Sequence, residues 1–158
     1  MGRKHQKWGP GDVFLIPLKD GSSVVAQVLD MMMPNVASCA IFDIRITPTA
    51  PPPKVDLDTH KLISKIATAR HHFDAGAWKV IGHQKPSLPQ RKWPNEQFRR
   101  RGWIGAEHYT GAIVEDFLNA NYALAPWDVY KDPNYFDKFL LSPATKPANV
   151  IYAKRAPD

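Results

Sequence analysis

The chain of 158 residues has a single cysteine and no long apolar run. Cys39 therefore cannot form an internal disulfide, and because its neighbours are typical of a strand we expect a small buried hydrophobe rather than a reactive thiol. The apolar stretch at residues 13–18 is too short for a signal peptide or a membrane span. Without a targeting signal, the sequence predicts a cytoplasmic protein with no membrane partner.

Recognisable catalytic motifs are also missing. The sequence has no G-x-S-x-G elbow, no Walker-type phosphate loop and no dinucleotide fingerprint. Paired carboxylates occur at 115–116 and 56–58, but no nucleophile or base lies at a recognisable spacing from either pair. Charge at a helix start and in turns accounts for both pairs. We therefore predict a protein that is not an enzyme and takes no cofactor.

The six histidines lack the paired spacings that are typical of zinc sites. His71 and His72 are adjacent, so they face opposite sides of a strand and diverge by about 100° on a helix. We expect no metal site. The alternative is a hydrolase that uses His71, His72 or His83, and alanine substitution of all three would test it.

The length predicts one domain spanning 1–158, with a core that needs no disulfide or metal. The 15 prolines are about twice the ordinary share and cluster at 48–53 and 86–94, which indicates loops. Three strands are expected before the first cluster, at 12–18, 23–29 and 36–46, with turns at Asp20-Gly21 and at Pro34-Asn35. We expect a type I′ turn at Asp20-Gly21, because both residues tolerate positive φ.

The rest of the chain mixes short strands and helices. Residues 57–72 fit either a helix or a strand, and we favour a strand near 63–70. A turn at 74–76 and a strand at 78–82 indicate a second hairpin. Apolar spacing predicts a helix over 110–122 capped by Thr110, and a shorter one that starts at Asp132-Pro133 and ends before Pro143. Residues 150–152 are expected as a last edge strand.

The net charge of +6 is concentrated in residues 79–101, which hold seven basic residues and one acid. We predict that the loop 85–103 binds a partner through the following side chains: Arg91, Lys92, Trp93, Phe98, Arg99, Arg100, Arg101 and Trp103. Arginine beside aromatic residues is typical of protein interfaces. The same composition suits phosphate contacts and base stacking. The third alternative is a solvated loop whose aromatic residues cover the core.

A family resemblance lies in the first half of the chain. The sequence reads GDVFLIPLKDG at 11–21, VAQVL at 25–29 and WKVIG at 78–82, which resembles the immunity protein 26 family of bacterial polymorphic toxin systems. The resemblance implies a cytoplasmic protein that protects its own cell by binding and blocking a protein toxin. It supplies no catalytic residues. Because opposite charges steer association, a basic inhibitor implies a toxin with an acidic face or a contact through another surface.

The sequence thus predicts an α+β fold with a strongly bent, mostly antiparallel sheet or a partly open SH3-like barrel. Two helices are expected in the C-terminal half of the chain, near 111–122 and 133–140. The leading functional hypothesis is an immunity protein that neutralises a toxin by protein–protein contact. The rival hypothesis is a nucleic-acid-binding module that uses the loop 85–103.

Overall fold

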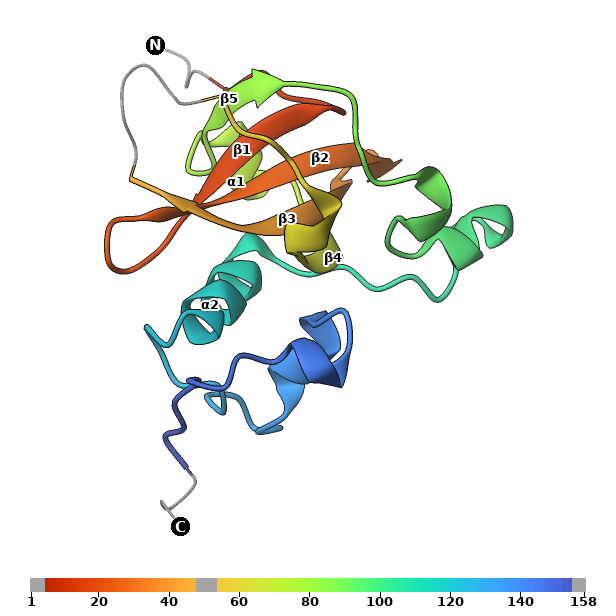
Figure 1. Cartoon of the computed structure of the whole chain (residues 1–158). Helices are drawn as coiled ribbons and strands as arrows, with labels where there is room; N and C mark the ends of the chain where they lie inside the picture. The colour runs from red at the N-terminus through yellow and green to blue at the C-terminus, as the bar shows by residue number, and fades with distance from the viewer. Residues whose placement is uncertain (1–4, 48–53, 155–158) are drawn as a thin grey trace.

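The computed structural model describes residues 5–47 and 54–154, so the proline cluster at 48–53 lies outside the described residues. Five strands form one open antiparallel sheet in the order β4-β3-β2-β1-β5 (Figure 1). The strands are β1 (Asp12–Pro17), β2 (Ser23–Met33), β3 (Val36–Ile46), β4 (Leu62–Ala69) and β5 (Val80–His83). The α+β fold with a bent, open sheet is confirmed.

The predicted meander forms β1 to β3, with turns where the sequence indicates them. In β1, Val13 and Leu15 contribute to one face of the sheet, and Phe14 and Ile16 to the other. All four are buried. A strand that is covered on both faces needs such an unbroken apolar run, which is why the sequence signal was strong here.

The expectation of a type I′ turn at Asp20-Gly21 is wrong. Gly21 has a φ of 87°, but Asp20 does not have a positive φ. The backbone N–H of Leu18 donates to the carbonyl of Ser22 (2.8 Å), which closes a three-residue loop. Such a loop is typical of a type I turn followed by a left-handed glycine. The Asp20 carboxylate accepts from the Ser22 backbone N–H (3.0 Å) and is ion-paired with Arg45, which fixes the loop in this form.

Residues 57–72 contain a strand, as favoured, flanked by the 3₁₀ helix η1 (Thr59–Lys61) and the short helix α1 (His71–Asp74). The second hairpin is not formed, because β5 pairs with β1 at the opposite edge of the sheet. The outer edge of β4 is occupied by Tyr109, which exchanges backbone hydrogen bonds with Ala67 and Ala69 (3.0 and 2.9 Å). Trp78, expected in the strand, precedes β5 and is fully buried.

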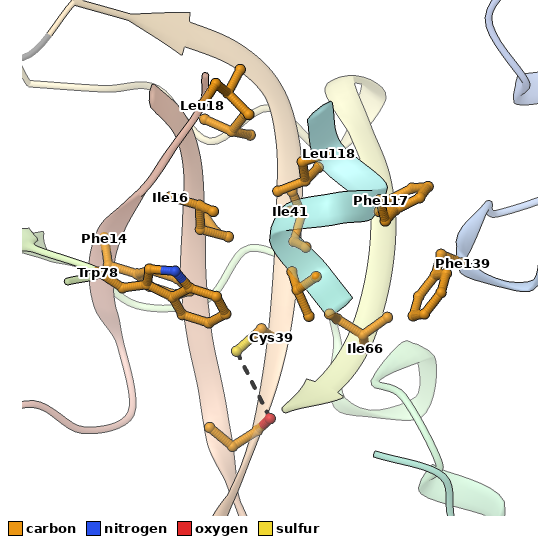
Figure 2. Packing of buried hydrophobic residues seen from close by; sticks show 14 of the residues in the cluster. Phe14, Ile16, Leu18, Cys39, Ile41, Ile66, Trp78, Phe117, Leu118 and Phe139 are labelled. Carbon is orange, nitrogen blue, oxygen red and sulfur yellow. Dashed lines mark hydrogen bonds between the residues drawn. The ribbon is translucent and has the colours of Figure 1, made fainter. Parts of the chain in front are cut away.

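The predicted main helix is α2 (Gly111–Asn121), and the Thr110 side chain caps it by accepting from the Ile113 backbone N–H (3.4 Å). Figure 2 shows this helix against the sheet, with Leu118 beside Ile41 and Phe117 on the side of Phe139. Cys39 is buried in the same layer, and burial raises the pKa of its thiol. The expectation of a small buried hydrophobe is confirmed.

The second predicted helix is the 3₁₀ helix η4 (Tyr135–Phe139), followed by η5 (Pro143–Thr145). Asp132 does not cap a helix; its carboxylate accepts from the Asn134 backbone N–H (2.9 Å) in a turn before η4. Residues 150–152 form no regular strand, since Ile151 makes only an isolated bridge with Pro126. In Figure 1 the segment from η4 to η5 lies beside α2 on the side away from the sheet, and Phe136 and Phe139 pack against Phe117 there.

Candidate partner-binding site

The residues predicted to bind a partner lie in an irregular unit beside the sheet, which we call the basic lobe (residues 85–106; green in Figure 1). It contains two 3₁₀ helices, η2 (Gln90–Lys92) and η3 (Glu96–Arg101). The two helices are adjacent, and the Gln90 side-chain amide donates to the Glu96 carboxylate (3.1 Å). Prolines exclude a sheet ladder here, so side-chain contacts must hold the segment in place.

Two tryptophans attach the basic lobe to the rest of the chain. Trp93 packs against the apolar cluster on the sheet face opposite α2, and its indole N–H donates to the Leu88 carbonyl (2.8 Å). Trp103 packs against a separate cluster that includes Met32 of β2 and Ala67 of β4. Both rings are half-buried. The aromatic residues of this segment therefore cover apolar surface, as one of the three alternatives expected.

A polar contact that the sequence analysis missed closes the base of the basic lobe. Asn95 has a left-handed backbone (φ 63°), and its side chain bonds both backbone groups of Glu107: Nδ2 donates to the carbonyl (2.8 Å) and Oδ1 accepts from the N–H (3.3 Å). Asparagine after proline is a turn signal, and Asn is among the few residues that tolerate this backbone. That signal indicated a turn but not its partner twelve residues further on.

Arg99 is engaged inside the basic lobe. Its guanidinium bonds Glu96 through Nε (2.6 Å) and Nη2 (2.9 Å), lies 3.8 Å from the carboxylate of Asp30 in β2, and stacks on Trp103 at 4.7 Å from the ring centroid. These hydrogen bonds hold the pKa of Glu96 below its usual value and raise the pKa of Arg99. Arg99 therefore stabilises η3 from within and also connects η3 to the sheet.

Five cations of the basic lobe remain unpaired. They are exposed and form no ion pair with any residue that the structure describes: Lys85, Arg91, Lys92, Arg100 and Arg101. The ammonium of Lys65 in β4 donates to the Lys92 carbonyl (2.7 Å), which brings a sixth cation to the same side. Burial, and to a smaller degree the charge of Lys92, lowers the pKa of Lys65.

The eight predicted contact residues thus divide into two groups. Trp93, Phe98, Arg99 and Trp103 hold the basic lobe together, since Phe98 in turn lies against Gly105. Arg91, Lys92, Arg100 and Arg101 point their charge into solvent. This second group can bind carboxylates or phosphates without breaking any internal contact.

One of the candidate catalytic histidines, His83, lines a groove together with Lys85 and Trp93 of the basic lobe. His83, at the end of β5, bonds the Asp12 carboxylate through Nδ1 (2.9 Å) and stands between two grooves of about 730 and 520 Å³ at the sheet edge. His72 lies 3.6 Å from Glu115, which also accepts from the Trp78 indole (3.1 Å). Over residues 5–47 and 54–154, no three His, Cys, Asp or Glu side chains are grouped closely enough to hold a metal ion.

An open antiparallel sheet with few helices defines an α+β protein, and the comparison with protein families is more specific. The family model for Immunity protein 26 matches residues 9–110, and the chain belongs to this family. The match contains all five strands and the basic lobe, and it ends just before α2. No curated protein and no solved structure matches the chain. In the described part of the chain, no helix has the length and apolarity to cross a membrane.

Proposed function

We propose that this member of the Immunity protein 26 family neutralises a bacterial protein toxin by binding it, without catalysis, and that the basic lobe carries the contact. The family supports an immunity role. The five unpaired cations of the basic lobe support this choice of surface, because solvent-exposed charge of one sign steers an oppositely charged partner. The expected partner is a toxin with an acidic face.

Co-expression with a candidate toxin, taken from the gene next to the one for this chain, tests the proposal. Cells that produce both proteins should survive, and the two proteins should elute together from gel filtration. The triple variant Arg91→Glu, Arg100→Glu, Arg101→Glu should lose the complex while its melting temperature stays the same, because these side chains form no ion pair with any described residue. Growth arrest and no complex with the wild-type chain would exclude toxin neutralisation. An undiminished complex of the triple variant would exclude only the surface.

A second candidate function is nucleic-acid binding, which the same unpaired cations favour. The tryptophans count against it, since Trp93 packs on the core and the Arg99 guanidinium covers one face of Trp103. Base stacking needs free aromatic faces. If this function is correct, affinity for single-stranded DNA falls steeply as salt rises, and removing Arg91, Arg100 and Arg101 flattens that dependence. No detectable binding at low salt would exclude it.

A further inference from the structure

Ile104, near the C-terminal end of the basic lobe, is the most exposed large apolar side chain of the described residues. Its exposed fraction is 77%, against 41–45% for the other members of this group: Val129, Leu141 and Ile151. One exposed apolar residue is ordinary on a protein surface. The significance of Ile104 therefore depends on how it is held and on what surrounds it.

The turn that carries Ile104 is fixed from both sides. Trp103 has a φ of 68°, a left-handed backbone that bulky residues rarely adopt, and its ring packs inward. Gly105 lies so close to the Phe98 ring that an added Cβ would be 3.0 Å from it. The Trp103 N–H donates to the Phe98 carbonyl (2.9 Å), and the Ala106 N–H donates to the Trp103 carbonyl (3.0 Å). Ile104 thus projects from a backbone that needs little ordering on binding.

Two unpaired arginines lie close to Ile104 along the backbone. The Ile104 N–H donates to the Arg101 carbonyl (3.3 Å), and Arg100 directly precedes Arg101 in the chain. Neither guanidinium has a partner among the described residues, in contrast to Arg99. Arginine is enriched among the few positions that dominate binding energy in protein interfaces, and an aliphatic side chain that fills a pocket can be the anchor of such a contact.

We propose that Ile104 is the apolar anchor of the toxin contact: it enters an apolar pocket on the toxin whose rim carries carboxylates, and Arg100 and Arg101 pair with that rim. This inference rests on the proposed function. The planar arginine side chain suits two-point contact with a carboxylate. An anionic membrane fits less well, because one isoleucine offers too little apolar area for stable membrane binding.

Binding to the purified candidate toxin, measured by titration calorimetry, tests the anchor. Ile104→Ala should weaken binding by about 10-fold, and Ile104→Asp by about 100-fold because it also adds a charge that the carboxylate rim repels. Leu141→Asp and Ile151→Asp are matched controls, since both side chains are exposed and lie outside the basic lobe. These controls should bind like the wild-type chain, and all variants should keep its melting temperature.

The arginines give a second measurement. Arg100→Glu with Arg101→Glu should weaken toxin binding by about 10-fold or more and reduce its dependence on salt. Arg100→Lys with Arg101→Lys keeps the charge but loses the two-point contact, so it should weaken binding less than the glutamate pair and leave the salt dependence in place.

Three other outcomes would contradict the role of Ile104 as the anchor, and each has a different meaning. Wild-type affinity in Ile104→Asp overturns the anchor and leaves toxin neutralisation intact. No complex with the wild-type chain overturns both. If Ile104→Asp instead abolishes binding to vesicles of phosphatidylserine and phosphatidylcholine, and toxin affinity is unchanged, Ile104 belongs to a membrane contact.

Discussion

The sheet and the basic lobe are stabilised in different ways. In the sheet, neighbouring residues of β1 and β2 are buried on opposite faces, and ladder hydrogen bonds satisfy the backbone. The basic lobe has no ladder. A few side chains, above all Trp93, Asn95 and Trp103, connect it to the rest of the chain. Apolar burial is therefore spread over many residues in the sheet and concentrated in a few contacts in the basic lobe.

This difference determines where charge can accumulate. The inner residues of β1 to β3 are covered on both faces, and an unpaired charge there would be costly. The basic lobe needs only its aromatic and amide contacts for attachment, so its remaining side chains are free to carry charge. A rigid sheet that positions a binding loop is a common arrangement for binding sites.

The largest expected effect lies in the layer between sheet and α2. Phe117 is fully buried and stacks on Phe139 at 5.1 Å between ring centroids. Phe117→Ala should lower the free energy of unfolding by about 3–5 kcal/mol, measured by urea titration. Ala112→Ser on the exposed side of the same helix is the control, with a change within about 0.5 kcal/mol. Similar losses in both variants would contradict this account of the core.

A smaller and more local effect is expected from Trp103→Ala. Removing this half-buried ring should cost about 1–2 kcal/mol, and hydrogen exchange should accelerate in residues 96–106 while β1 to β3 keep their protection. Ile104→Ala, one residue away and exposed, should leave exchange unchanged. Uniform acceleration through sheet and basic lobe would show that the two regions are not separately stabilised.

Acid should loosen the basic lobe before it unfolds the sheet. Hydrogen bonds from Arg99 lower the pKa of Glu96 in the folded chain. Such a carboxylate contributes stability above its unfolded pKa, about 4.3, and loses that contribution as the pH falls through the lower folded value. The hydrogen-exchange protection factors of residues 96–103, which allow for the slower intrinsic exchange in acid, should therefore fall below about pH 4.3.

Glu96→Gln is the control for this acid effect, and it should abolish the pH-dependent step in residues 96–103. Global stability is a poor readout here, because the pKa values of Asp20 and Asp74, outside the basic lobe, are lowered too. If the pH-dependent step persists in Glu96→Gln, another titrating group causes it.

The smallest effect is expected at Cys39. Its thiol is buried in β3, and burial raises its pKa, so the reactive thiolate is scarce. Iodoacetamide should leave the folded chain almost unmodified and react quickly in urea, as mass spectrometry can measure. Trp103→Ala should not increase the rate, whereas Phe117→Ala should. Rapid modification of the folded wild-type chain would contradict the burial of this strand.

Local signals predicted most of the regular structure. The meander, the strand within 57–72 and the helix capped by Thr110 all follow from apolar periodicity, turn residues and caps within a few positions. The sequence did not predict the partner strand of β5, because that pairing depends on which edge of the sheet is free. Tyr109, forty residues beyond the edge of β4, occupies that edge and leaves only β1 available. The type I′ turn failed because Asp20 bonds Ser22 and pairs with Arg45.

The loop with the net charge was evident from the sequence, but the roles of its residues were not. Arg99, Arg100 and Arg101 are equivalent in the sequence. Glu96 lies only three residues before Arg99, but the fold alone brings Arg99 towards Asp30 and leaves the other two arginines in solvent. The exposure of Ile104 likewise depends on the inward turn of Trp103.

By itself, the sequence determined the strands, the main helix and the position of the positive charge, because these depend on neighbouring residues and on composition. The tertiary structure decided the pairing of β5. It also decided which residues hold the basic lobe together and which carry unpaired charge. Those features depend on groups that are distant in the chain, such as Met32 beneath Trp103 and Glu107 bound by Asn95. No local pattern specifies such contacts until the sheet has brought these groups together.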